Sequence, residues 1–153
     1  MRKKFISVFI LFLVCALVLT ACSGNTRYKN LAELSKAVEF TVVQPAVVPD
    51  GYTAAGYFAN GKNIAEIVYV NGDKQLIFVM TTSKKVECDL APFEETKDVK
   101  AGGTLFTLSL SGGLVHLAVA QAGKYNYAFY SKTGISESDA MRMAEGLNIG
   151  NVK

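Results

Sequence analysis

The stretch TLFTLSLSGGLVHLAVAQ, residues 104–121, is the clearest indicator of the fold. Apolar residues alternate with small or polar ones around Gly112-Gly113, and paired glycines supply the positive φ angles of a two-residue hairpin turn. Such a turn places Ser111 opposite Leu114 and gives the hairpin one strongly apolar face and one mixed face. The apolar face then holds Phe106, Leu108 and Leu110 beside Val119, Leu117 and Val115, and the mixed face holds Leu105, Thr107 and Ser109 beside Ala120, Ala118 and His116.

The same β-type pattern continues on either side of this hairpin, over residues 39–131. Turn dipeptides such as Asn60-Gly61 recur at short intervals with no helical segment between most of them, which argues for an antiparallel meander. A turn at Asn71-Gly72 or Gly72-Asp73 builds a second core face, made of Ala65, Ile67, Tyr69, Leu76, Phe78 and Met80. The expected strands cover roughly 39–44, 52–59, 63–70, 74–82, 93–100, 104–111, 114–121 and 125–131.

A helix is expected at each end of this meander. Asn30 is a candidate N-cap with Glu33 three positions later, and apolar residues then recur at helical spacing over 31–38. The segment Ser136-Glu137-Ser138-Asp139 is a capping-box pattern that precedes an apolar stripe at helical spacing. That stripe is made of Ala140, Met143, Ala144 and Leu147. The expected fold class is α+β: a curled antiparallel meander of about seven or eight strands, with a short N-terminal helix and a C-terminal helix packed on it.

The amino terminus indicates where the protein works. Three basic residues, Arg2 to Lys4, precede an apolar run over 5–19 in which Ser7 is the single polar residue, which is typical of a secretory signal. The run ends in Leu19-Thr20-Ala21-Cys22, which resembles a bacterial lipoprotein lipobox. The resemblance implies that Cys22 receives a diacylglyceryl group and that the chain is cut before it. We therefore expect a signal peptide at 1–21, a lipidated tether at 22–30, and a single domain at 31–153, held at the extracytoplasmic face of the cell membrane. An outer membrane is the alternative location in a cell with two membranes.

An uncleaved transmembrane anchor is the alternative for residues 1–21. This apolar run is at the short end of the roughly 20 residues that a spanning helix needs. The residues that follow Cys22 are small and polar, with no basic stop-transfer cluster. These features favour the lipoprotein interpretation.

Charge and cysteine content exclude several classes of function. The chain has 16 basic and 13 acidic residues, and removing the three basic residues of the signal leaves 13 of each. This balance indicates neither a nucleic-acid partner nor a broad basic patch for anionic lipid. Cys15 leaves with the signal and Cys22 carries lipid, so Cys88 remains alone, and no disulfide is expected inside the domain. We expect no cofactor.

Two groups of polar residues are candidate reactive sites. His116 is the only histidine, with Ser109 as its expected cross-strand neighbour, but a hydrolase also needs an orienting acid and an oxyanion hole. One histidine and one cysteine are too few for the usual zinc site. An acidic cluster offers oxygen ligands for calcium, although its alternation with lysines is more typical of a solvated loop and edge strand. The cluster consists of Glu87, Asp89, Glu94, Glu95 and Asp98. We therefore expect neither catalysis nor a bound metal.

The aromatic residues Tyr125, Tyr127 and Phe129 are the candidate ligand groove. Alternating aromatics in a strand either pack the core or line an open groove for an apolar or peptide ligand. The number of residues in the turn at Gly123 decides which face receives them, and the sequence leaves that number open.

Three segments of the expected domain resemble a known family. The segments VEFTVVQP (38–45) and VPDGY (48–52) resemble the opening of an uncharacterised extracytoplasmic domain family, and residues 134–145 resemble its terminal helix. That family occurs in Gram-positive lipoproteins and in anti-sigma-factor-like membrane proteins. The resemblance implies an extracytoplasmic location and supplies no catalytic residues.

Three functions are compatible with this sequence. The leading hypothesis is a non-catalytic binding or sensing module that contacts another protein of the envelope. The second is a carrier, similar to periplasmic lipoprotein-carrier proteins, which holds an acyl chain between sheet and helix. The third is a hydrolase centred on His116. A carrier needs a hollow apolar cavity, whereas a binding module needs a closed core and an exposed patch.

Overall fold

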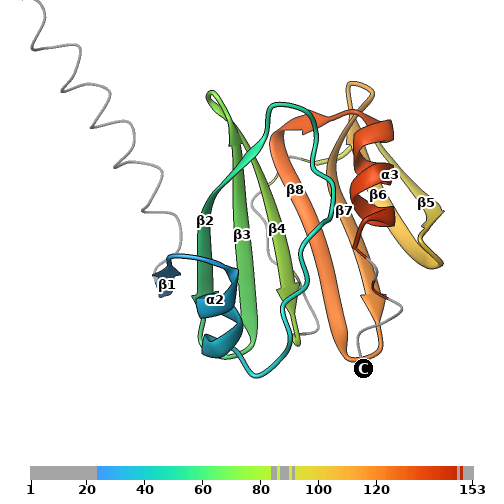
Figure 1. Ribbon diagram of the computed structural model, residues 1–153. Helices are drawn as coiled ribbons and strands as arrows, with labels where there is room; N and C mark the ends of the chain where they lie inside the picture. Colours follow the sequence, from blue (N-terminus) through green and yellow to red (C-terminus); the bar gives the residue numbers. More distant parts are fainter. Residues whose placement is uncertain (1–23, 84–85, 87–89, 91, 148, 150–153) are drawn as a thin grey trace, which may run out of the picture.

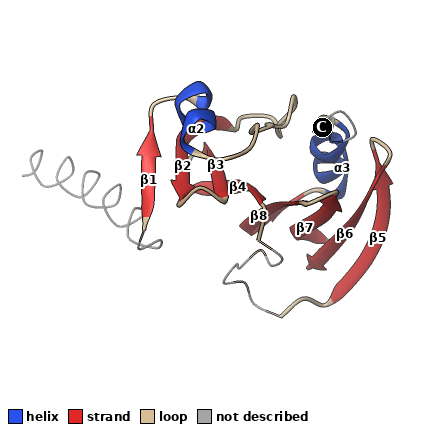
Figure 2. Cartoon of the chain, turned by 90° about the horizontal axis from the view of Figure 1, so that it is seen from below, coloured by secondary structure: helices blue, strands red, loops and turns tan. Residues whose placement is uncertain are grey.

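The chain forms one curved antiparallel sheet with two helices on the same side (Figures 1 and 2). The computed structural model describes residues 24–83, 86, 90, 92–147 and 149. The α+β class is confirmed, as are the helices near the two ends of the domain. The elements are β1 (Asn25–Tyr28), α2 (Leu31–Ala37), β2 (Thr53–Asn60), β3 (Ile64–Asn71), β4 (Lys74–Thr81), β5 (Glu95–Ala101), β6 (Thr104–Ser111), β7 (Leu114–Ala122), β8 (Tyr125–Ile135) and α3 (Glu137–Glu145).

The sheet consists of two meanders joined at its centre. Its strand order is β1-β2-β3-β4-β8-β7-β6-β5, so the last strand of the chain pairs with β4. This pairing buries β8 in the middle of the sheet and leaves β1 and β5 as its two edges. Both helices lie over one face, α2 beside β2 and α3 beside β5 and β7 (Figure 2). We call this the covered face, and the opposite one the second face.

Glycine-containing turns set the register, as the sequence predicts. Ser111 pairs with Leu114 across Gly112-Gly113, whose φ angles are +58° and +75°. Only glycine adopts these angles readily. The turn between β3 and β4 is Gly72-Asp73, and its register places the six residues of the second predicted core face together. These predictions are confirmed.

The register within the β6–β7 hairpin differs from the prediction beyond its first two pairs. Leu110 pairs with Val115 as expected, but Leu108 pairs with Ala118. A bulge at His116 causes this shift, because that residue has no partner in either neighbouring ladder. An extra residue in one strand displaces every later pair by one position. The predicted neighbours of Phe106, Leu108, Thr107 and Ser109 are therefore wrong.

Residues 39–44, predicted as a strand, form no strand. They belong to an extended segment, residues 38–52, that crosses the covered face between the two helices (Figure 1), and we call it the strap. Val38, Phe40 and Val42 are buried, whereas Glu39 and Thr41 point to solvent. The alternation that predicts a strand is therefore real. It arises because the strap lies flat on the sheet and buries every second side chain.

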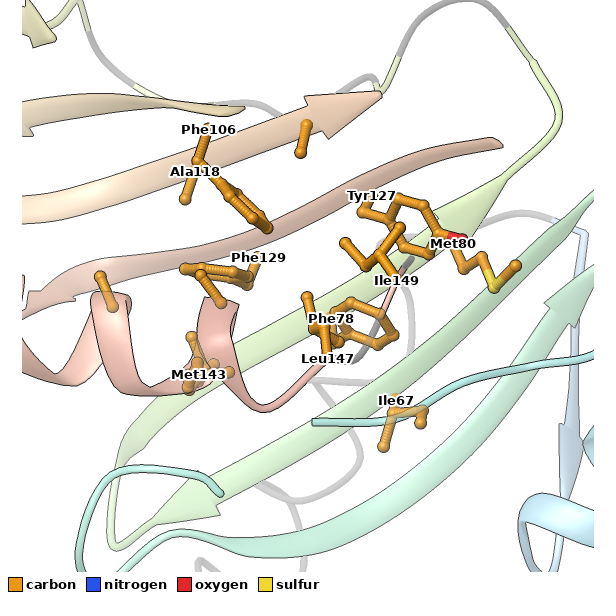
Figure 3. Packing of buried hydrophobic residues seen from close by; sticks show 14 of the residues in the cluster. Ile67, Phe78, Met80, Phe106, Ala118, Tyr127, Phe129, Met143, Leu147 and Ile149 are labelled. Atoms are coloured by element: carbon orange, nitrogen blue, oxygen red, sulfur yellow. The ribbon is translucent and has the colours of Figure 1, made fainter. Parts of the chain in front are cut away.

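The strap and the helices close the core over the covered face. The centroids of the Phe40 and Tyr125 rings are 5.8 Å apart. The backbone N–H groups of Glu39 and Ala46 donate hydrogen bonds to the carbonyl oxygens of Lys62 and Gly146, respectively. Leu147 and Ile149, which follow α3, pack over the centre of the sheet (Figure 3). The result is a closed apolar core.

The amino-terminal boundary of the domain also differs from the expectation. The predicted tether covers 22–30, but Asn25–Tyr28 form β1 and pair with β2, from Asn25 opposite Asn60 to Tyr28 opposite Tyr57. Asn30 is the N-cap of α2, as predicted, because its Oδ1 accepts a hydrogen bond from the backbone of Glu33 at 2.9 Å. Folded structure therefore begins three residues after Cys22.

The cap of α3 gives a first testable prediction. Ser136 Oγ accepts a hydrogen bond from the backbone N–H of Asp139 at 3.1 Å. Replacing Ser136 with alanine leaves this N–H without its partner, so we expect the free energy of unfolding to fall by about 1 kcal/mol in urea titrations. Ser136→Asn is the control, since asparagine caps helices equally well and adds no charge beside Asp139. An unchanged unfolding midpoint in Ser136→Ala would show that the cap contributes nothing.

Candidate functional site

The three aromatic residues of the candidate groove lie within the core. The β7–β8 turn is Gly123-Lys124, with Ala122 opposite Tyr125, and this even-numbered turn directs Tyr125, Tyr127 and Phe129 toward the covered face. All three side chains are buried beneath the strap and α3. The Tyr125 and Tyr127 ring centroids are 6.5 Å apart, and the Phe129 centroid lies 6.0 Å from that of Phe106. Their arrangement is that of core packing, the alternative to an open groove.

Tyr127 has one unusual feature, a hydroxyl group without a hydrogen-bond partner. This residue is fully buried beside Met80 and Ile149 (Figure 3), and within the described part of the chain its hydroxyl meets no donor or acceptor. Burial raises the pKa of Tyr127, and the neighbouring Tyr125 raises it further. An unsatisfied buried hydroxyl is costly, so the position is a candidate contact for a polar group of a ligand.

His116 lies at the bulge of β7 and is half-buried. Its Nδ1 is 3.1 Å from the carbonyl oxygen of Ser131, and because a carbonyl only accepts, Nδ1 carries the proton. Ser131 in turn donates from Oγ to the carbonyl of Gln75 at 2.7 Å. A backbone carbonyl thus orients the imidazole where a hydrolytic triad would use a carboxylate.

The expected serine partner of His116 lies elsewhere. Ser109 is opposite Leu117 in the β6–β7 ladder, because the bulge at His116 shifts the register. Ser109 is also buried. Among the described residues of the β6–β7 ladder, no accessible serine therefore lies opposite His116.

The acidic cluster is spread out rather than convergent in its described part. Glu94 accepts a hydrogen bond from the backbone of Gly112 at 2.9 Å, and Asp98 accepts one from the Thr107 hydroxyl at 2.7 Å. Glu87, Asp89 and Cys88 lie outside the described residues. Among the residues that the structure does describe, no group of three or more His, Cys, Asp or Glu side chains is placed to hold a metal ion.

The second face carries a band of half-buried apolar side chains. Register places Ile77 opposite Val68 and Tyr130, and Tyr130 opposite Leu117. The adjacent row contains Val119 beside Ala128, which is fully buried. No element of regular structure described here covers this band, because both helices lie on the other side (Figure 2). An apolar band on an otherwise polar surface is typical of a protein–protein contact.

Near β1, the second face also holds a half-buried carboxylate. Glu66 Oε2 accepts a hydrogen bond from Asn25 Nδ2 at 3.1 Å, while Asn25 Oδ1 is buried without a partner in the described part of the chain. Burial raises the pKa of Glu66, and the hydrogen bond from Asn25 partly opposes this rise. The ionised carboxylate is therefore less stable here than in water. This pair ties the first strand to the sheet, and sequence reasoning missed it because the two residues are far apart in the chain.

The raised pKa of Glu66 predicts a specific pH dependence. A carboxyl whose folded pKa exceeds its unfolded pKa binds its proton more tightly in the folded state, so its contribution to stability falls as pH rises through that interval. Glu66→Gln removes this loss and keeps an acceptor for Asn25. We expect the variant to be more stable than the parent at pH 7, by less than about 1 kcal/mol, and equally stable at pH 3. Urea unfolding at both pH values, with Glu95→Gln as the exposed control, tests this; a variant that is less stable at pH 7 contradicts it.

Comparison of the chain with protein-family models, with curated proteins and with solved structures finds no match in any of the three. Among the helices of the described residues, none is long and apolar enough to cross a bilayer. Residues 1–21 and Cys22 lie outside that part of the chain.

Proposed function

We propose that this chain is a lipoprotein, anchored through Cys22 at the extracytoplasmic face of a bacterial membrane, whose domain binds an envelope partner without catalysis. The lipobox-like Leu19-Thr20-Ala21-Cys22 supports the anchor. The resemblance of the domain to an extracytoplasmic family supports the location. The observation that carries the binding role is the contrast between the two faces of the sheet.

The covered face is closed, whereas the second face keeps some partly exposed apolar side chains. Side chains at the centre of the covered face, such as Phe78 and Leu108, are fully buried under the strap and α3. A permanently hollow carrier would instead keep a cavity of several hundred Å³ between sheet and helix. On the second face, Ile77, Leu117 and Val119 stay partly exposed. A closed core with a partly exposed apolar band fits a binding module.

Site-specific crosslinking in the native membrane tests this proposal. A photoreactive phenylalanine analogue at Ile77 or Val119 samples the second face, and the same analogue at Lys74, an exposed site at the start of β4, is the control. We expect one defined crosslinked protein from both second-face positions and none from the control. Equal crosslinking from all three positions, or from the control alone, would contradict a specific contact through this face.

A lipid carrier is a second candidate, favoured by the unpartnered hydroxyl of Tyr127. A ligand could reach this group only if the strap moved away, because Phe40 and Tyr125 pack over the region. Mass spectrometry of lipid extracted from the natively purified protein separates the two functions. A stoichiometric non-covalent lipid, lost in Tyr127→Phe, would support the carrier, and absence of such a lipid supports the closed binding module.

A further inference from the structure

The start of the first strand, three residues after Cys22, and three turns of the sheet lie at the same end of the domain. Cross-strand pairs form a continuous row that begins at Asn25, three residues after Cys22. The row runs through Asn25, Asn60, Ile64, Thr81, Asn126 and Gln121. Just beyond it lie the β2–β3 turn, the β7–β8 turn and the β5–β6 turn (Figure 1). A lipid on Cys22 would therefore hold this end of the sheet close to the bilayer.

Exposed lysines gather at this end. Lys62 and Lys124 lie in the turns, and Lys100 pairs with Leu105 next to the β5–β6 turn. Lys36 lies in the last turn of α2, and Glu39, two residues after the helix, donates a backbone hydrogen bond to the carbonyl of Lys62. We call the group Lys36, Lys62, Lys100, Leu105 and Lys124 the anchor rim. Glu39 and Glu145 also lie at this end, where Glu39 pairs with Lys62 at 2.8 Å, and the Glu66 carboxylate accepts a hydrogen bond from Asn25.

The opposite end of the domain is acidic. Its turns and the start of α3 carry more carboxylates than cations, and two of the cations are already paired, Lys97 with Glu137 and Arg142 with Asp139. The carboxylates are those of Asp50, Asp73, Glu94, Glu95, Glu137 and Asp139, and the cations are Lys74, Lys97, Lys132 and Arg142. The balanced total charge therefore conceals a separation of charge along the strands, with the positive end at the anchor.

An exposed apolar side chain completes the rim. Leu105 is 61% exposed, more than the other large hydrophobic residues that the structure describes as exposed. It lies one residue from the β5–β6 turn, opposite Lys100 on the edge strand β5. Lysines and an exposed apolar side chain at one end of the sheet match the interface of an anionic bilayer, where lysines meet headgroups and the apolar group enters the acyl boundary.

We propose that the anchor rim is a docking surface for anionic lipid headgroups, so that the domain stands with this rim on the bilayer and its acidic end outward. The inference rests on the proposed lipid anchor at Cys22, which places the rim at the membrane. The lysines and Leu105 then fix the orientation of the domain relative to the surface. This orientation leaves the second face perpendicular to the bilayer and open to a neighbouring protein.

Two matched tryptophan reporters test the orientation, because the chain contains no tryptophan. Leu105→Trp places a reporter at the rim, and Leu114→Trp places one at another exposed leucine at the far end. The acylated full-length mature protein is reconstituted into phosphatidylcholine vesicles with about 30% phosphatidylglycerol and lipids brominated on their acyl chains. We expect strong quenching and a blue-shifted emission for Leu105→Trp and neither for Leu114→Trp. Equal quenching of the two reporters, or stronger quenching of Leu114→Trp, would overturn the proposal.

Charge reversal separates electrostatic docking from simple tethering. In the Leu105→Trp background, Lys100→Glu with Lys124→Glu should reduce quenching by at least about twofold, as should vesicles without phosphatidylglycerol. Lys74→Glu with Lys132→Glu, at exposed lysines away from the rim, is the matched control and should leave quenching unchanged. Quenching that changes neither with the Lys100→Glu and Lys124→Glu substitutions nor with the charge of the lipid would overturn the role of the lysines.

The same samples distinguish failure of this inference from failure of the proposed function. Intact-mass measurement and flotation of the vesicles report acylation and anchoring independently of the tryptophans. A chain without acyl groups would refute the anchor itself. An acylated, floating protein whose Leu105→Trp reporter is unquenched would refute only the docking orientation.

Discussion

Replacing Phe129 with alanine is expected to lower the free energy of unfolding by about 3–5 kcal/mol. Phe129 lies between Phe78 on β4 and Ala118 on β7, at the junction of the two meanders, and its side chain is buried. Met143 of α3 packs over it (Figure 3). Truncation removes a large apolar side chain and leaves a cavity where the sheet halves and α3 meet. Because domains are stable by only about 5–15 kcal/mol, this loss is a large part of the total.

Urea unfolding followed by tyrosine fluorescence measures this effect. Leu105→Ala is the control, since its side chain is mainly exposed and should change the free energy of unfolding by less than about 0.5 kcal/mol. A loss below about 1 kcal/mol in Phe129→Ala would contradict a core that is closed and well packed at this position.

Replacing Cys22 with serine is expected to abolish lipid attachment altogether. The proposed diacylglyceryl group forms a thioether with the Cys22 sulfur, and serine offers no sulfur for it. Each buried methylene contributes about 0.8 kcal/mol, so the acyl chains supply most of the affinity of the cleaved chain for the bilayer. The domain itself should still fold, because its first strand begins at Asn25.

Labelling of growing cells with a palmitate analogue, followed by membrane flotation, tests this prediction. The parent chain should be labelled and should float, whereas Cys22→Ser should be unlabelled and should accumulate with residues 1–21 still attached. Cys15→Ser and Cys88→Ser are the controls, and both should behave as the parent does. Labelling of Cys22→Ser equal to that of the parent would show that lipid is attached elsewhere.

Local signals in the sequence predict much of this fold. The pairs Gly112-Gly113 and Gly72-Asp73 determine where strands reverse, because Gly72, Gly112 and Gly113 adopt positive φ angles that favour glycine. Asn30 and Ser136 determine where the helices begin, through side-chain bonds to the following turn. These features depend on a few adjacent residues, so a single sequence is enough to identify them.

Features that depend on distant residues could not be predicted in the same way. The alternation over 39–44 shows that one side of the segment is buried, but it does not distinguish a paired strand from a strap lying flat on the sheet. The bulge at His116 depends on both neighbouring strands, since it is unpaired toward β6 and toward β8. The strand β1 has too little apolar character to be predicted from its own residues, because it forms only by pairing with β2, which lies farther along the chain.

The candidate site shows the same limit. The aromatic alternation of Tyr125, Tyr127 and Phe129 is clear in the sequence, but the face that receives them depends on the length of the β7–β8 turn. A balanced charge count likewise gives no sign that lysines and carboxylates separate to opposite ends of the sheet, because that separation arises from strand order.

Mass spectrometry of the amino-terminal peptide from the natively expressed, membrane-extracted protein tests the lipid anchor directly. We predict a peptide that begins at Cys22, with a diacylglyceryl group on its sulfur. An unmodified Cys22 in a peptide that still carries residues preceding it would contradict the anchor, the location and the proposed function together.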